Sequence, residues 1–307
     1  MYLYIPEDAK EIEDIPEYIT PIYGPVKDVC VVSSGAMDFF DSASALSNVR
    51  YSALKSEDWE DEEVQRLMNL GEIEYCGKYS APDYELLKRE GTGLILENTM
   101  INHSPGVLKQ LRSLGFPVIT EYSSLEENVL GRMEWIKLIG LMTGHDKEAL
   151  EAFETQEELI KSLSFEDKEA RKVAFFYITS TGGVSIKKGN DYIVNMIETA
   201  GGEYAFKDIA QAGTGSSVIQ VESFYEAARD ADLFIYNSSI GGMPASAEEL
   251  RLRCPLLEKC RAFNGGKIYS TSSDMYKSVM RSGEIIKEIN EMISGNEGSL
   301  KYFYRLK

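Results

Sequence analysis

Cysteine and histidine, the side chains that most often ligate transition metals, are scarce in this sequence. It has four cysteines and two histidines, and no Cys-x-x-Cys pair that would indicate a zinc site. Cys30 and Cys76 lie in apolar, strand-like runs, where cysteine usually behaves as a small buried hydrophobe. Cys254 and Cys260 are close enough in sequence to close a small loop. We therefore expect no site for a bare metal ion, and a metal carried by this chain would arrive already chelated.

Motifs of catalysis and phosphate binding are also absent. No Gly-x-Ser-x-Gly elbow, Walker glycine loop or His-Glu-x-x-His helix occurs in the sequence. The glycine-rich segments 181–183 and 213–215 lack the lysine and the spacing of a phosphate-binding loop. The sequence therefore gives no positive sign of an enzyme, although aspartate and glutamate could serve as general acids or bases.

Length and charge limit the class of protein. A chain of 307 residues is long for one α/β core and suits two lobes. A net charge of −18 opposes binding to nucleic acid and to anionic lipid headgroups. No apolar run approaches the roughly 20 residues needed to cross a bilayer. The first ten residues lack the basic and apolar regions of a signal peptide, so we expect either a cytosolic chain or one whose signal has been removed.

Short apolar runs alternate with helical periodicity in two stretches of the chain. Strands are expected at 29–32, 73–76, 93–96 and 117–120, and again at 173–178, 233–236 and 267–269. Helices are expected at 36–46, 84–89 and 106–114, and again at 192–200, 222–229 and 282–293. This alternation predicts two Rossmann-like α/β lobes with mostly parallel sheets.

A helical segment separates the two stretches. Ser124 and Glu127 have the spacing of a capping box, and apolar residues then recur at helical intervals as far as Met142. A break or kink is expected at 144–146, with a second helical stretch at 147–163. We predict an N-terminal lobe at 1–123, a long backbone helix region at 124–164, and a C-terminal lobe at 165–307.

Ligands of such sheets lie beyond the carboxyl ends of the strands, so we expect a ligand cleft between the lobes. Tyrosine offers a flat apolar face with a polar tip, which suits a large planar or macrocyclic ligand. The candidate ligand-binding residues of the N-terminal lobe are Ser34, Tyr79, Glu97, Asn98 and Tyr122. Those of the C-terminal lobe are Tyr177, Thr181, Lys187, Tyr192, Tyr236, Asn237, Ser273 and Met275.

Four segments in order, 27–40, 81–96, 111–144 and 189–224, carry a family resemblance. They include Ala81-Pro82-Asp83-Tyr84-Glu85 and Glu198-Thr199-Ala200-Gly201-Gly202. With them the chain resembles the iron-complex and cobalamin class of substrate-binding proteins of ABC importers, which have a helical backbone between their lobes. The resemblance implies no enzymatic activity, no tightly bound cofactor, a monomer, and a cargo that is a ferric siderophore, haem or corrinoid.

The resemblance also implies a location and partners. Such proteins act outside the membrane, often through a lipid anchor, and deliver their ligand to an ABC permease dimer with its ATPase. Surface glutamates that match Glu85 and Glu222 would dock onto permease arginines. The few arginines in the expected ligand loops argue mildly against a strongly anionic ligand, and His103 could serve as an axial ligand. A two-lobe enzyme and a permease-independent sensor are the alternatives.

Overall fold

Contacts within the computed structural model group the chain into two units. The structure describes residues 1–9, 12, 14–59, 61–89, 91–163, 170–276 and 279–307. Unit 1 comprises Met1–Ser124 with Met133–Glu154, and unit 2 comprises Leu125–Arg132 with Thr155–Lys307. The predicted boundary between residues 164 and 165 lies outside the described residues, so the predicted domain limits stay a prediction.

Unit 1 is built on a parallel sheet with the strand order β5-β4-β3-β8-β9. The central strands are short and apolar, and every residue of β3 and β8 is buried. These strands are β3 (Val29–Val31), β4 (Val49–Ser52), β5 (Glu74–Tyr75), β8 (Leu94–Glu97) and β9 (Val118–Thr120). The helices of the unit before residue 114 are α1 (Ser34–Ser42), α2 (Glu62–Asn69), α3 (Tyr84–Arg89) and α4 (Pro105–Ser113).

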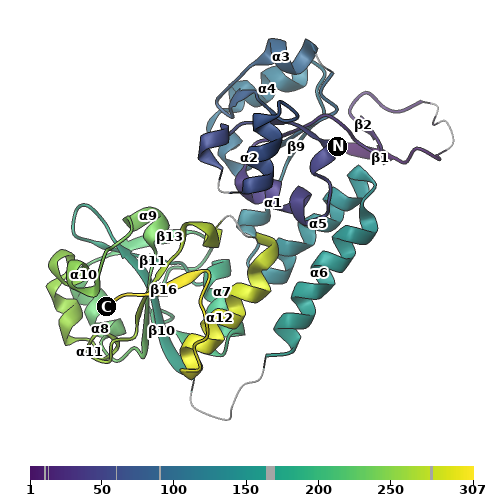
Figure 1. Cartoon of the computed structure of the whole chain (residues 1–307). Helices are drawn as coiled ribbons and strands as arrows, with labels where there is room; N and C mark the ends of the chain where they lie inside the picture. The colour runs from purple at the N-terminus through teal and green to yellow at the C-terminus, as the bar shows by residue number, and fades with distance from the viewer. Residues whose placement is uncertain (10–11, 13, 60, 90, 164–169, 277–278) are drawn as a thin grey trace. The chain divides into compact units, whose positions relative to one another are not determined.

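Two small strand pairs accompany this sheet. The parallel pair β1 (Tyr2–Ile5) and β2 (Thr20–Tyr23) lies near the N-terminus of the chain (Figure 1). The antiparallel pair β6 (Gly77–Lys78) and β7 (Ala81–Pro82) forms a hairpin between β5 and α3.

Unit 2 has a mixed sheet with the order β13-β11-β10-β14-β15-β16, and β12 also pairs with β10. The central strands are parallel, whereas β11, β13 and β16 are antiparallel to their neighbours. The parallel strands are β10 (Arg171–Ile178), β12 (Gly202–Tyr204), β14 (Leu233–Tyr236) and β15 (Ile268–Thr271). The antiparallel strands are β11 (Val184–Lys187), β13 (Ser216–Ile219) and β16 (Phe303–Arg305).

Helices cover both faces of this sheet. Helices α7 (Tyr192–Thr199) and α12 (Ser282–Ser294) pack together on one face, and α8 (Val221–Ala228), α10 (Ala247–Arg253) and α11 (Arg261–Asn264) lie on the other (Figure 1). The short helix α9 (Ser238–Gly241) directly follows β14. The core is aromatic, and the Phe176 and Phe224 rings lie 4.7 Å apart between their centroids.

Two helices form the predicted backbone region. Helix α5 (Val129–Thr143) and helix α6 (Asp146–Lys161) run side by side in opposite directions (Figure 1). Gly144 has a φ of +79°, and the amide of His145 donates to the carbonyl of Gly140, which is the hydrogen bond of a Schellman helix stop. The break predicted at 144–146 is confirmed. It ends α5 and turns the chain into α6, so the two helices form a hairpin and not one bent helix.

The first helix of this region begins later than the Ser124 capping-box pattern predicts. Ser124 belongs to a 3-10 turn, and α5 begins five residues later at Val129. The amide of Val129 donates to Oδ1 of Asn195, and that of Leu130 donates to Oδ1 of Asn128. Two asparagines therefore satisfy the first helix amides, and the capping box of Ser124 and Glu127 does not form.

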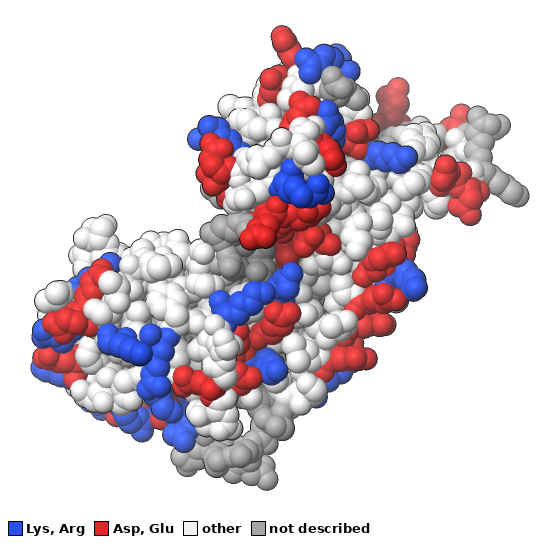
Figure 2. Space-filling view, viewed as in Figure 1, with Lys and Arg blue, Asp and Glu red and all other residues white. Residues whose placement is uncertain are grey.

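The surface is mixed in charge. Figure 2 shows acidic and basic side chains interspersed on the visible face, with acidic side chains following α6. Within the described part of the chain, no helix combines the length and the apolar character that a membrane span requires.

Candidate functional site

The parallel strands of unit 1 end at one edge, where several predicted site residues lie. Ser34 is the first residue of α1, directly after β3, and its side chain is half-buried. Asn98 follows β8, and its Oδ1 accepts from the amide of Met100 at 2.9 Å, which caps the following 3-10 turn. Tyr122 follows β9 and is 42% exposed. The strand-end rule thus places these three residues at one sheet edge.

Glu97 is the most unusual group at this edge. It is the last residue of β8 and only 2% exposed, and its Oε2 has no hydrogen-bond partner among the described residues. Burial disfavours the carboxylate and raises the pKa of Glu97 to about 7. Near neutral pH this side chain is therefore partly protonated, and it can donate a hydrogen bond as well as accept one.

Unit 2 brings three predicted residues into one polar and aromatic group. Lys187 ends β11, and its Nζ lies 3.5 Å from Oδ1 of Asp191. The same Nζ lies 5.9 Å from the ring centroid of Tyr192 and 5.6 Å from that of Tyr276. Asn237, which follows β14, donates from Nδ2 to the hydroxyl oxygen of Tyr276 at 2.9 Å. Lys187, Tyr192 and Asn237 are thus linked, although β11 runs opposite to β14.

Asp191 holds this group in place. Its Oδ1 accepts from the amide of Ile193 and so caps α7, and its Oδ2 accepts from the amide of Gly215 at 2.8 Å. Lys187 and Asp191 are 7% and 3% exposed. Burial lowers the pKa of Lys187, Arg132 lowers it further, and the neighbouring Asp191 carboxylate opposes both.

Arg132 completes the group, and the sequence reasoning missed it. Its guanidinium carbon lies 3.8 Å from the ring centroid of Tyr192, and the residue is 7% exposed. It comes from α5, not from a loop after a strand, so a search confined to strand ends passes over it. We call Arg132, Lys187, Asp191, Tyr192, Asn237 and Tyr276 the Arg132 cluster.

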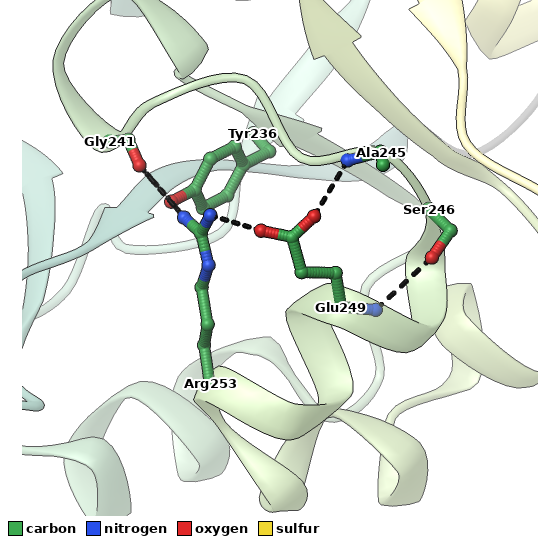
Figure 3. Close-up of polar contacts among 6 residues, drawn as sticks. All are labelled: Tyr236, Gly241, Ala245, Ser246, Glu249 and Arg253. Carbon is green, nitrogen blue, oxygen red and sulfur yellow. Dashed lines mark hydrogen bonds and ion pairs between the residues drawn. The ribbon is translucent and has the colours of Figure 1, made fainter.

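Tyr236 points to a different part of unit 2. Its hydroxyl donates to the carbonyl of Gly241 at 3.1 Å and accepts from Nη1 of Arg253 at 3.0 Å. Arg253 also pairs with Glu249, whose Oε2 accepts from the amide of Ala245 (Figure 3). The predicted residue Tyr236 is completely buried and has both sides of its hydroxyl occupied.

A surface cavity of about 640 Å³ lies beside this arrangement. Tyr177, Thr179, Ile240, Gly241 and Arg253 are among its lining residues. It follows the carboxyl end of β10, so it is a second place in unit 2 where a small molecule has room.

The other predicted ligand residues have more ordinary surroundings. Tyr79 sits in the turn between β6 and β7 and packs against the core of unit 1. Thr181 is exposed, and its hydroxyl lies 3.0 Å from that of Thr179. Ser273 is exposed, whereas Met275 is 5% exposed and belongs to the core of unit 2. No geometry here singles these four residues out as ligand contacts, and their role stays a prediction.

Glu85 and Glu222 occupy matching positions in the two units. Each is exposed in the first turn of a helix, α3 and α8. Each helix is followed by a central strand, β8 or β14, that has a parallel neighbour on either side. Neither carboxylate has an ion-pair partner within the described ranges.

Metal-ligating side chains do not gather in the described part of the chain, where no three His, Cys, Asp or Glu residues are placed to hold an ion. Cys30 and Cys76 are buried with their sulfur atoms 3.4 Å apart. His103 is exposed at the end of a 3-10 turn that follows β8.

Solved structures with the same arrangement of elements are binding proteins. The periplasmic haem-binding protein HutB of Vibrio cholerae matches with a TM-score of 0.70 and 14% identity, over 86% of this chain and 98% of that one. A periplasmic binding protein from Veillonella parvula matches with a TM-score of 0.72 and 13% identity, over 89% and 93%. The chain has the fold of the helical-backbone substrate-binding proteins. The predicted fold class is therefore confirmed.

The names of the sequence relatives give no activity. An uncharacterised lipoprotein of Methanocaldococcus jannaschii is 25% identical over 93% of this chain and 69% of its own length. A second uncharacterised lipoprotein of that organism is 27% identical over 66% of this chain and 53% of its own length. No family model matches the chain.

Proposed function

We propose that this protein is the extracytoplasmic solute-binding protein of an ABC importer, and that it captures a metal chelate and delivers it to a permease. The observation that carries the proposal is a likeness of fold over nearly the whole chain. HutB and the Veillonella parvula protein are each matched over more than nine tenths of their length. A two-lobe fold alone hosts several functions, so the proposal also rests on the site.

The site supports a ligand that needs hydrogen bonds and aromatic faces. In unit 2, Tyr192 and Tyr276 lie beside charged and amide groups, which is the mixture that orients a ligand in a mostly apolar site. In unit 1, Ser34, Asn98 and Tyr122 lie beyond the strand ends. We infer that each unit contributes ligand-binding residues from the carboxyl edge of its own sheet or beside it.

A chelated metal is the cargo that fits best. A bare transition metal would need clustered histidines or cysteines, and the described residues offer no such group. Solved proteins of similar fold include periplasmic haem-binding proteins and a possible iron-binding protein. The ligand class proposed is therefore a ferric siderophore, haem or corrinoid, and the protein itself holds no tight cofactor.

Location and partners follow from the same proposal. Two sequence relatives are named lipoproteins, which supports a lipid anchor and a place outside the membrane. Glu85 and Glu222 would pair with arginines of a permease dimer that works with an ATPase. The binding protein would act as a monomer, and no nucleic-acid partner is expected from its charge of −18.

Identifying a bound cargo tests the proposal. The protein is purified from its native source and its small molecules and metals are determined by mass spectrometry. Thermal unfolding is then followed with haemin, corrinoids and ferric siderophores. A true ligand raises the melting temperature in a concentration-dependent way. Absence of any co-purified chelate, together with no thermal shift from any of the three classes, would reject the proposal.

A further inference from the structure

The charges of the Arg132 cluster do not balance. Lys187 and Arg132 are two cations, and Asp191 is the carboxylate that contacts the cluster among the described residues. Asp191 pairs with Lys187, and both of its oxygens accept backbone hydrogen bonds as well. One positive charge, that of Arg132, is left without an anion among the residues that the structure describes.

The tyrosines beside Arg132 do not supply this anion. Burial raises the pKa of Tyr192, and it raises the pKa of Tyr276 well above the usual value. Both phenols are therefore neutral at physiological pH. The Tyr192 ring offers only its π face to the guanidinium, at 3.8 Å.

The hydrogen bonds of Arg132 are also incomplete. Its Nε and Nη1 are buried and have no hydrogen-bond partner in the described part of the chain. Oδ1 of Asn237, at the other end of the cluster, lacks a partner too. Buried polar groups in native proteins are nearly always satisfied, and an unpaired buried charge is especially unfavourable. A site that leaves a guanidinium and an amide oxygen open in this way is arranged to receive a polar group from outside the chain.

We propose that the Arg132 cluster binds an anionic carboxylate group of the ligand, with Arg132 as its charge partner and Tyr192 as the surface that fixes the guanidinium. Arginine donates to carboxylate oxygens in a planar geometry, and charge-assisted hydrogen bonds of this kind are the strong ones. The open Oδ1 of Asn237 accepts a hydroxyl or amide donor of the same ligand. This inference rests on the proposed function, and it replaces the expectation of a ligand without strong negative charge.

Three probes separate the anion site from chelate binding in general. Metal-free citrate carries carboxylates without iron, ferric citrate carries both, and ferrichrome is an uncharged ferric hydroxamate. Sodium chloride at equal ionic strength controls for screening. The variants are Arg132→Met, which keeps the length of the side chain, and Arg132→Lys, which keeps its charge. Lys137→Gln is the matched control, because it removes an exposed cation from the same helix.

Citrate and ferric citrate are expected to raise the melting temperature of the wild type and of Lys137→Gln. Arg132→Met should bind ferric citrate roughly 10- to 100-fold more weakly than the wild type does. The affinity of Arg132→Lys should lie between those of the wild type and Arg132→Met. Without any probe, Arg132→Met should be at least as stable as the wild type, since it removes an unpaired buried charge.

The outcomes distinguish the two proposals. Ferric citrate affinity that is unchanged in Arg132→Met overturns the anion site, as does a wild type that responds only to ferrichrome. If the wild type binds metal-free citrate through Arg132 but binds neither ferric citrate nor ferrichrome, the anion site is supported and chelate capture is rejected. If Arg132→Met does not fold, the affinity of Arg132→Lys decides, because loss of the guanidinium geometry alone must still weaken citrate binding.

Discussion

Nδ2 of Asn237 donates a 2.9 Å hydrogen bond to the hydroxyl oxygen of Tyr276, while Oδ1 of the same amide has no partner among the described residues. Asn237 is only 1% exposed, so water does not readily replace its bond to Tyr276. The bond joins the end of β14 to the 3-10 turn at Ser273–Tyr276. It therefore fixes the amide in one orientation and leaves the acceptor side open.

Tyr276→Phe tests how much this bond stabilises unit 2. The change leaves Nδ2 buried without an acceptor, so the free energy of unfolding should fall by about 1–3 kcal/mol. Urea denaturation measures the change. Tyr225→Phe is the control, because Tyr225 is partly buried on α8 and no side-chain hydrogen bond of it is described. Equal stabilities of the two variants would contradict the argument.

Two glycines of α5 should respond oppositely to the same substitution. A Cβ at Gly140 would lie 2.5 Å from Cβ of Ala149 and 2.9 Å from the carbonyl oxygen of His145. A Cβ at Gly131 would meet only the flexible carboxylate of Glu126, at 3.4 Å. Gly140→Ala should therefore destabilise the protein by about 1–3 kcal/mol, since the two helices of the hairpin must separate.

Gly131→Ala should instead stabilise it by up to about 1 kcal/mol, because alanine loses less backbone entropy in a helix than glycine does. Thermal and urea unfolding of the two variants give the comparison. If Gly140→Ala is also stabilising, then the close approach of α5 and α6 at that position is wrong.

The alternation of strands and helices was predictable because the central strands are apolar and buried on both faces. The predicted strand at 233–236 and the predicted helix at 84–89 match the observed limits. Strand β13 escaped prediction because Ser216–Ile219 is half-exposed and polar, and its pairing with β11 depends on residues some 30 positions away in sequence. Helix α2 escaped because its eight residues are mostly polar and only two of them are buried.

The candidate site could be predicted only in part, for a related reason. Tyr192 begins a predicted helix and Asn237 directly follows a predicted strand, so both positions were recognisable. Lys187 lies between the predicted strand at 173–178 and that helix. Arg132 lies within an apolar helix, where its neighbours in sequence suggest an exposed position. Its burial depends on the Tyr192 ring, sixty residues further along the chain. Local sequence does not encode that contact.

Glu97 makes stability depend on pH. The folded-state pKa of about 7 lies above the ordinary value of 4.5, so the neutral form is favoured by folding. Its contribution is fully present below about pH 4.5 and is lost as pH rises through 7, by about 3 kcal/mol at pH 8. Glu97→Gln, which is neutral at all pH values, should be more stable than the wild type at pH 8 and nearly equal to it at pH 5.

Urea denaturation of both proteins at pH 5 and pH 8 measures this difference. Glu72→Gln removes an exposed carboxyl from the same unit and should change stability little at either pH. A Glu97→Gln variant that is less stable than the wild type at pH 8 would show that the buried carboxylate has a favourable partner.

Glu85 and Glu222 should matter for transport and not for ligand binding. Each is exposed at the start of a helix that leads into a central parallel strand, so the two units present their carboxylates from equivalent places in their folds. Exposed charges act mainly through orientation and encounter rate. The double variant Glu85→Ala, Glu222→Ala should therefore reduce uptake at least tenfold in cells that express the permease and ATPase.

The affinity of the purified double variant for its ligand should stay within about twofold of the wild type, because neither side chain contacts the proposed site. The control is Glu226→Ala on the same helix as Glu222, where the carboxylate pairs with Arg229 at 3.4 Å and is already neutralised. Uptake that falls equally in the control would mean that general loss of negative charge is responsible. A loss of ligand affinity in the double variant would instead assign the two glutamates to binding, and docking would then have to use another surface.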